Sequence, residues 1–130
     1  MPDKKSVKGR FITNSPEGTL FVITGQVTSN SVKPASHAKV TGTLLTKGKV
    51  KAREKTVFCG NVIDEEKLKT LDMAKIEELL SNRDGKNGTN TSITMAQPVS
   101  FMIVFSDLPD NLENFTVTVA GFDKKSKNNS

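Results

Sequence analysis

The side chains that most often perform nucleophilic chemistry are scarce in this sequence, which has one cysteine, Cys59, and one histidine, His37. A thiol becomes reactive when an imidazole or another cation beside it lowers its pKa. His37 belongs to a different predicted strand, and no carboxylate lies near it in the sequence to orient its ring. We therefore expect Cys59 to be a small buried residue at a strand end and His37 to be a partly exposed surface residue. The sequence predicts no catalytic residue, and we expect a protein that is not an enzyme.

Metal and cofactor sites are not indicated either. Asp107, Asp110 and Glu113 follow one another at three-residue spacing in a predicted loop. The glycine and the tight alternation of ligands that calcium loops use are missing, so a polar loop is the better interpretation. One cysteine and one histidine form neither an internal disulfide nor a Cys/His zinc site, and no glycine-rich phosphate loop precedes a helix. We predict no metal ligand, no cofactor-binding residue and no cofactor.

The positive charge of the chain is concentrated at its two ends. The sequence has 130 residues and a formal net charge of +5. Residues 1–10 and residues 124–130 each carry a net +3, so residues 11–123 hold 12 basic and 13 acidic side chains. Charge confined to polar ends is typical of mobile tails rather than of a surface that binds nucleic acid. The longest apolar run, residues 101–105, is far shorter than the ~20 residues of a membrane span.

One basic pattern lies within the body of the chain, at every second position of residues 47–55. Its members are Lys47, Lys49, Lys51, Arg53 and Lys55. On a β-strand this spacing places all five side chains on one face. One interpretation is the solvated face of an edge strand, where lysine prevents pairing with other sheets. The alternative is a binding stripe for an acidic partner, a polyanion or a phospholipid head group. We expect no nucleic-acid partner, because no exposed aromatic residue is interleaved with the basic ones.

The elements that position these residues are mostly strands. Alternating apolar residues predict about seven of them, at residues 10–14, 19–29, 37–46, 50–59, 91–96, 99–106 and 115–122. Between the fourth and the fifth, apolar residues at three- and four-residue spacing predict one helix over about residues 64–82. Asp64 is its expected N-cap. Asp72 is a second candidate N-cap, which predicts a kink or a split near residues 70–73.

These elements predict a mainly β fold, and within that class an immunoglobulin-like β-sandwich with one inserted α-helix. The Cys…Trp…Cys pattern of antibody domains is absent, so the likeness is one of architecture. We expect a single domain over residues 9–123, with disordered basic tails at residues 1–8 and 124–130. We also expect a monomer.

Three groups of residues, taken in order, resemble the motifs of a known family. The first is Phe21-Val22-Ile23 with Gly25, Val27 and Asn30. The second is Val57-Phe58-Cys59-Gly60-Asn61, followed by a helix that bears Leu68 and Leu71. The third is residues 98–105, preceded by Asn90 and followed by Phe115-Thr116-Val117. Through these motifs, residues 9–122 resemble the bacterial domain of unknown function 3426 family.

The resemblance implies an immunoglobulin-like fold and an extracytoplasmic, periplasmic-side position on a membrane-anchored bacterial protein. In that family the domain commonly follows a zinc ribbon and one transmembrane helix, and neither is present in this sequence. The family has no established catalytic or binding residues to carry over.

We therefore expect a non-catalytic domain with a structural or protein–protein interaction role in a bacterial cell-envelope protein, with a protein partner that is not identified. Domains of this kind recruit partners by adding a strand to a sheet edge or by loop contacts. The alternative function is small-molecule or lipid binding in a pocket between the inserted helix and the sandwich. A third hypothesis is polyanion binding by the basic stripe of residues 47–55.

Overall fold

The structure, a computed structural model, describes residues 6–29, 35–94 and 97–124. Its elements in chain order are β1 (Lys8–Asn14), β2 (Gly18–Val27), β3 (Ala35–Thr46), β4 (Val50–Phe58), α1 (Glu65–Leu68), α2 (Met73–Leu80), the 3-10 helix η1 (Lys86–Gly88), β5 (Val99–Phe105) and β6 (Leu112–Lys124). The prediction of a mainly β fold is confirmed.

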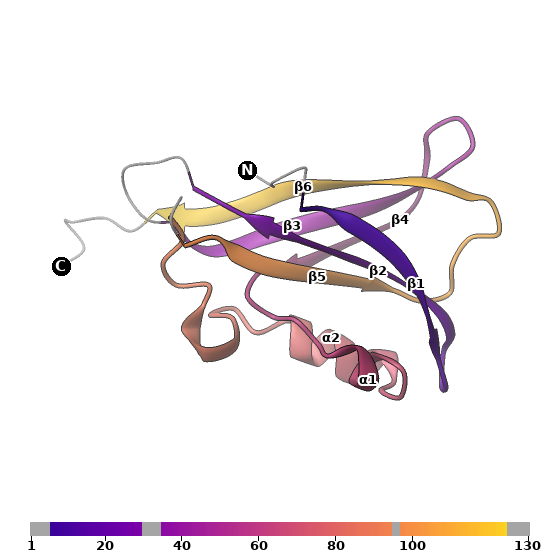
Figure 1. The fold of residues 1–130 in the computed structure, drawn as a ribbon. Coiled ribbons are helices and arrows are strands. Elements are labelled where there is room, and N and C mark those ends of the chain that lie inside the picture. The colour runs from indigo at the N-terminus through magenta and orange to yellow at the C-terminus, as the bar shows by residue number, and fades with distance from the viewer. Residues whose placement is uncertain (1–5, 30–34, 95–96, 125–130) are drawn as a thin grey trace.

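The strands form two antiparallel sheets of three strands each. Sheet A has the order β1-β2-β5, and sheet B has the order β4-β3-β6. β2 and β3 are therefore the central strands. β4 and β6 are the two edges of sheet B, and Figure 1 shows the long β6 along one rim of the molecule with both helices on the opposite side.

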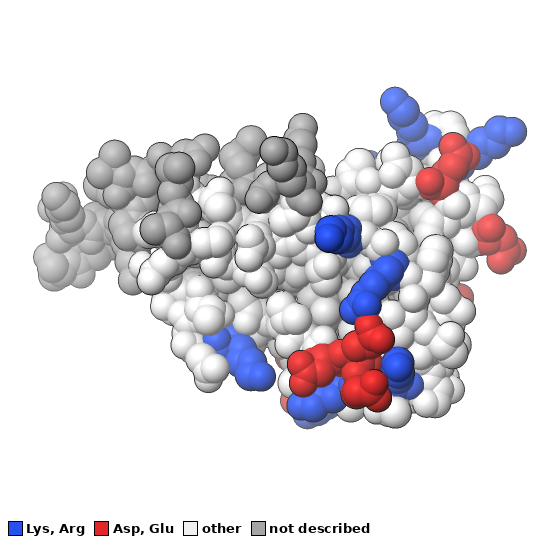
Figure 2. All heavy atoms as spheres, viewed as in Figure 1, with Lys and Arg blue, Asp and Glu red and all other residues white. Residues whose placement is uncertain are grey.

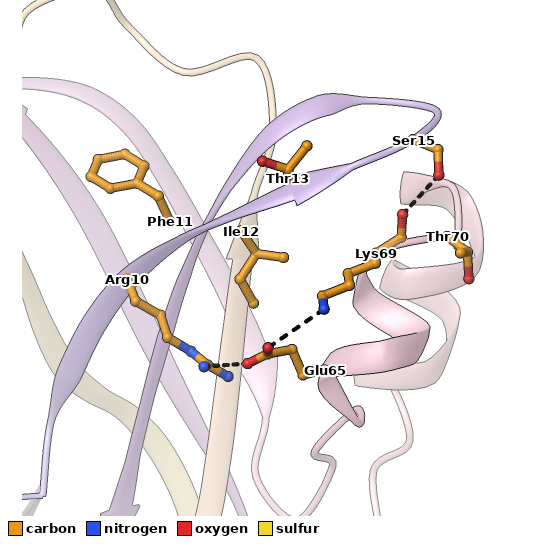
Figure 3. A pocket seen from close by; sticks show the side chains of 8 residues that line it. All are labelled: Arg10, Phe11, Ile12, Thr13, Ser15, Glu65, Lys69 and Thr70. Carbon is orange, nitrogen blue, oxygen red and sulfur yellow. Dashed lines mark hydrogen bonds and ion pairs between the residues drawn. The ribbon is translucent and has the colours of Figure 1, made fainter.

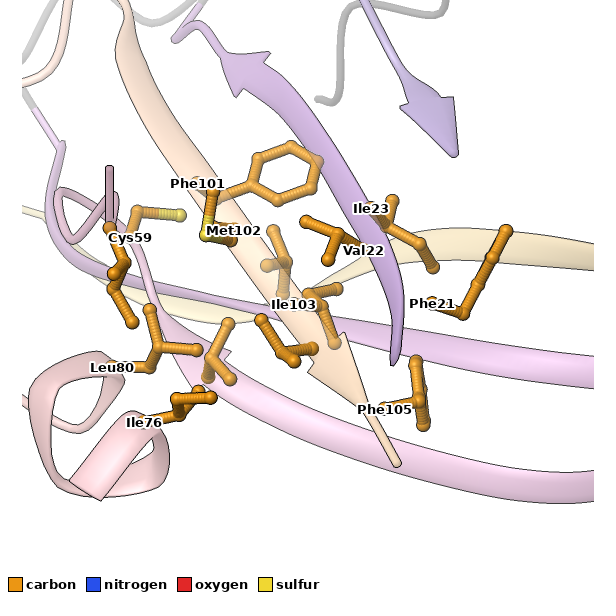
Figure 4. Close-up of a cluster of buried hydrophobic side chains, with 14 of the residues drawn as sticks. Phe21, Val22, Ile23, Cys59, Ile76, Leu80, Phe101, Met102, Ile103 and Phe105 are labelled. Atoms are coloured by element: carbon orange, nitrogen blue, oxygen red, sulfur yellow. The ribbon is translucent and has the colours of Figure 1, made fainter. Parts of the chain in front are cut away.

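The main core lies between the two sheets. A Cβ atom added to Gly42 of β3 would stand 2.8 Å from the Cδ1 atom of Ile103 and 3.4 Å from that of Ile23. A side chain at this position would force the buried Ile103 to move, which accounts for the glycine in the middle of β3. Ile23 and Ile103 are paired across β2 and β5, and both are fully buried (Figure 4).

The other face of sheet A is buried as well. Val22 and Val104 are paired across β2 and β5 on this face, and neither is exposed. Ile76 and Leu80 of α2 are buried and lie beside β5 (Figure 4). Because both faces of sheet A are covered, β2 and β5 are apolar in consecutive positions rather than only in alternate ones.

The single helix predicted over residues 64–82 is wrong in detail, because the structure has two short helices there. α1 ends at Leu68, and α2 begins at Met73. Asp72 caps α2 by accepting a hydrogen bond from the backbone N–H of Lys75 at 2.9 Å. The predicted split near residues 70–73 is therefore confirmed. Asp64 occupies the N-cap position of α1, but its side chain forms no capping hydrogen bond.

The turn between β1 and β2 holds the break between the helices. The amide of the buried Asn14 donates to the carbonyl oxygens of Leu68 at 2.6 Å and Leu71 at 2.8 Å. Glu17 accepts from the backbone N–H of Met73 at 3.0 Å. These bonds satisfy polar backbone groups that two helix ends would otherwise leave unpaired. The physical reason for the split is thus a contact between segments far apart in the sequence.

The described residues form six strands rather than about seven. In the segment predicted as a strand at residues 91–96, Ile93 forms only an isolated bridge with Ala35. The next residue, Thr94, turns back by exchanging backbone hydrogen bonds with Gln97. These bonds are made with Gln97 rather than with β3, so the pairing with β3 does not continue past Ile93 in the described residues. Residues 95 and 96 of that prediction lie outside the described residues.

The fold begins earlier than residue 9, where the domain was predicted to start. Lys8 pairs with Thr24, the Ser6 hydroxyl accepts from the backbone N–H of Gln26, and Val7 packs against the core. The prediction of a tail over residues 1–8 did not take account of Val7, which is apolar. Residues 1–5 and 125–130 of the predicted tails lie outside the described residues, and Lys124 belongs to β6. Within the described segments, no helix has the length and apolar character needed to cross a bilayer.

Candidate functional site

Cys59 follows β4 directly, one residue beyond the strand end at Phe58, and is completely buried, as the sequence predicted. Its backbone N–H donates to the carbonyl oxygen of Ala38 at 2.9 Å. Burial raises the pKa of the Cys59 thiol to about 12. A thiol with so high a pKa stays protonated at neutral pH and is a poor nucleophile.

His37 occupies a polar cluster that the sequence did not predict. Its ring is 21% exposed, with Nε2 2.9 Å from Asp84 Oδ1 and Nδ1 3.2 Å from Asp123 Oδ2. Arg83 also contacts Asp123, at 3.3 Å. Both ring nitrogens are thus occupied by carboxylates rather than directed at Cys59. The cluster joins the start of β3, the turn after α2 and the end of β6, so its side chains hold these three segments together.

Asp107, Asp110 and Glu113, for which we predicted a polar loop rather than a calcium site, do not converge on a common site. Asp107 accepts a hydrogen bond from Arg53 at 2.7 Å. Across the part of the chain that the structure describes, no group of three or more His, Cys, Asp or Glu side chains is placed to hold a metal ion. The arrangement of Asp107, Asp110 and Glu113 therefore offers no built cation site.

The basic stripe of residues 47–55 is divided by the structure. Lys47 and Lys49 lie in the turn between β3 and β4 rather than on a strand. A register shift between Leu44 and Leu45 pairs Leu44 with Arg53 but Leu45 with Lys51. Paired residues share a face, so this bulge places Lys51 and Arg53 on opposite faces of sheet B. The expected single cationic face is not formed.

The basic residues of β4 also have acidic neighbours. Lys51 lies 3.8 Å from Glu54 on the outer face of sheet B. Arg53 bonds to Asp107, and Lys55 bonds to Glu77 of α2 at 3.0 Å. Charges that are locally balanced in this way give β4 a structural role in attaching a loop and a helix.

The grooves beside the helices are open at the sides of the molecule. One of them, of about 600 Å³, lies between β1 and α1 (Figure 3). Within it Glu65 bonds to Arg10 and lies 3.9 Å from Lys69, so its one lining carboxylate is already paired with basic side chains. A smaller groove of about 290 Å³ lies between α2 and strands β4 and β5, where Leu80, Val57 and Val104 are among its lining residues. The side chains of Leu68 and Ile76 are buried under the two helices.

The strongest candidate site is the outer edge of β6, which is the last strand of sheet B in the described residues. β6 has 13 residues, and between Glu113 and Asp123 it contains no charged residue and no proline. Edge strands of natural proteins usually carry such residues, because they stop other strands from pairing. Among the described residues, no strand pairs with the outward-facing N–H and C=O groups of residues 114–122, and these residues include no charge or proline that would protect them.

Two irregularities delimit the regular part of this edge. Gly121 pairs with Lys39 and Val119 pairs with Val40, so Ala120 is the extra residue of a bulge. A second shift, next to Leu45, leaves Glu113 as an extra residue at the other end. Residues 114–119 pair with β3 without interruption. A segment of this length with high β-propensity, no charge and no proline has the composition that favours strand addition.

The two faces of the regular segment differ in chemistry. Thr116 and Thr118 are exposed on the outer face of sheet B. Phe115, Val117 and Val119 are only half-buried, although they point toward sheet A. We call the strip of residues 114–119 the β6 edge segment.

An aromatic seam runs alongside the β6 edge segment. The ring of Phe115 lies 5.4 Å from that of Phe21, and the ring of Phe21 lies 5.1 Å from that of Phe11. Phe11 is on β1, the edge of sheet A, and is 62% exposed. Exposed apolar surface therefore lies next to the backbone of the β6 edge segment.

On the face drawn in Figure 2, acidic and basic side chains gather near the helices, others lie near the β3–β4 turn, and basic side chains also lie between these two groups.

Sequence reasoning found the strand at residues 115–122 but not its position at an edge. The signal was present in the sequence, since the uncharged residues 114–122 contrast with the basic residues 47–55.

Comparisons of this chain with protein-family models, with curated proteins and with solved structures find no match in any of the three.

Proposed function

We propose that this protein is a non-catalytic β-sandwich domain of immunoglobulin-like type that acts as a protein–protein interaction module, and that it recruits its partner by strand addition at the β6 edge segment. The observation that carries the proposal is the absence of charge and proline from residues 114–122 on a strand at the edge of a sheet. Strand addition uses backbone hydrogen bonds for affinity and alternate side chains for specificity.

The sandwich interpretation is supported by the close packing of sheet B on sheet A. Ile103 and Ile23 of sheet A both approach the Gly42 position of β3. Antiparallel sheets stacked over one core are the defining feature of this architecture.

The non-catalytic interpretation is supported by the state of the two side chains best suited to nucleophilic chemistry. Burial keeps the Cys59 thiol protonated, and both nitrogens of His37 contact carboxylates. A cell-envelope location, on the extracytoplasmic side of a membrane-anchored bacterial protein, remains part of the proposal through the family resemblance.

The test uses a synthetic peptide of alternating threonine and valine, solubilised by a serine–glycine tail, as a generic strand. Hydrogen–deuterium exchange of the full chain is measured by mass spectrometry with and without the peptide, at a protein concentration low enough for the chain to be monomeric. We expect slower exchange of the β6 amides and unchanged exchange of the β4 amides. The double variant Thr116→Lys/Thr118→Lys is expected to lose this protection, because lysine at an edge disfavours pairing.

The matched control is Ala52→Lys/Thr56→Lys, which adds the same charge at two exposed positions of the opposite edge strand. Its β6 protection should equal that of the wild type. Protection that appears at β4, or that persists in Thr116→Lys/Thr118→Lys, contradicts the proposal.

A further inference from the structure

We propose that the partner of the β6 edge segment is a second copy of this chain, and that two copies form a closed dimer through antiparallel pairing of β6 with β6. This inference rests on the proposed function, because it assigns the partner that strand addition would recruit. It departs from the monomer expected from the sequence.

Electrostatics favours a second copy at this edge and disfavours it at the other. No charged residue lies within residues 114–122, so two β6 edges approach without like charges opposing one another. On β4, by contrast, pairing with a second β4 about a two-fold axis at Arg53 would oppose this basic residue to its own copy. Like charges directly opposite in a ladder are destabilising.

The side chains of the β6 edge segment are complementary to themselves in one register. A two-fold axis through Val117 pairs each Thr116 with Thr118 of the other copy, and each Phe115 with its Val119. The outer-facing residues then meet outer-facing residues, as ladder pairing requires. Threonine pairs and pairs of an aromatic with a β-branched residue are among the favourable cross-strand combinations.

The half-exposed apolar rim gives the dimer a second source of stability. Phe115, Val117 and Val119 are only half-buried in one copy, and Phe11 is 62% exposed beside them. Pairing of two β6 edges brings two such rims together along one axis, where burial of apolar surface stabilises association. The bulges at Glu113 and Ala120 mark where regular pairing ends.

The resulting assembly is closed. A two-fold interface uses the same surface on both copies, so it is satisfied by two chains. The outer edges of the joined sheet are then both β4, whose basic residues oppose further addition. The expected product is a dimer and not a filament.

The first test measures the mass of the full chain by sedimentation equilibrium over a range of concentrations. We expect a concentration-dependent dimer for the wild type and for the control Ala52→Lys/Thr56→Lys. For Thr116→Lys/Thr118→Lys we expect the dissociation constant to rise at least ~10-fold, since each lysine faces another across the axis. Circular dichroism verifies that the variants are folded.

The second test concerns the register. Val117→Cys places two thiols opposite each other at the two-fold axis, within the Cα separations that a disulfide accepts. We expect Val117→Cys to form a cross-linked dimer under mild oxidation faster than Thr118→Cys does. Cys59 is retained in both, because it is completely buried.

The outcomes separate this inference from the proposed function. The wild type could stay monomeric while the threonine–valine peptide still protects β6. That result would overturn the inference of a second copy but would still support strand addition at the β6 edge segment. Absence of both dimer and peptide protection overturns the two together. A dimer that persists in Thr116→Lys/Thr118→Lys, with no cross-link from Val117→Cys, uses a different surface and also overturns the inference.

Discussion

β4 and β6 flank the same central strand, β3, and each is the last strand on its side of sheet B in the described residues. β4 carries Lys51, Arg53 and Lys55, whereas β6 carries no charge between Glu113 and Asp123. Both strands pair antiparallel with β3 in the same sheet, so the sheet itself does not require the difference. The contrast indicates that one edge is closed to other strands and the other is left open.

The basic residues of β4 also bind the edge to the rest of the molecule. Lys55 reaches Glu77 of α2, and Arg53 reaches Asp107 in the loop after β5. β6 has contacts of this kind only at its end, where Asp123 meets His37 and Arg83 in the described structure. The open edge is therefore also the part of sheet B with the fewest side-chain attachments along its length.

The largest effect is expected from a residue that supports both edges. Leu44 is completely buried and pairs with Arg53 of β4 on one side and Phe115 of β6 on the other. Leu44→Ala should lower the free energy of unfolding by about 3 kcal/mol, through lost burial and the cavity that remains. Urea denaturation measures this change.

The neighbouring leucine provides the control. Leu45 is half-buried and faces outward, so Leu45→Ala should cost less than about 1 kcal/mol. Equal losses for both variants would show that the inner face of β3 is not the common support of the two edges.

A second prediction converts the closed edge into an open one. Lys51→Thr/Arg53→Thr/Lys55→Thr gives β4 an uncharged edge that resembles β6. The variant should then associate through both edges and form species larger than a dimer, with association strengthened at least ~10-fold over the wild type. Light scattering measures the mass.

The triple variant Lys47→Thr/Lys49→Thr/Lys67→Thr removes as much charge outside the strands and is the matched control. If the two triple variants have the same mass, charge on β4 is not what closes that edge.

Much of this architecture could be predicted from the sequence, because it depends on local patterns. Period-two alternation placed β2, β5 and β6, and Asp72 correctly predicted the break between α1 and α2. These features are set within a few residues of each other, where propensity and capping act.

The rest depends on contacts that no local pattern encodes. The carboxylates that hold His37 come from Asp84 and Asp123, which are 47 and 86 residues away in the sequence. The bulge that separates Lys51 from Arg53 follows from how β4 fits β3 and has no sequence signature of its own. The strand order that makes β6 an edge is likewise a long-range property, which is why the sequence predicted the strand but not its exposure.

The smallest predicted effect separates the two functions of charge on β4. Lys55 is 26% exposed at its side chain, donates to Glu77 and to the carbonyl oxygen of Val104, and lies 5.8 Å from the Phe105 ring centroid. Lys51 is 73% exposed and only 3.8 Å from Glu54. Lys55→Ala should lower the free energy of unfolding by about 1 kcal/mol, and Lys51→Ala by less than about 0.5 kcal/mol, because exposed ion pairs contribute little. Urea denaturation of both variants measures the two changes in the free energy of unfolding. Equal effects would mean that Lys55 does not anchor α2 to β4, and that its charge, like that of Lys51, acts at this edge only by opposing the approach of another strand.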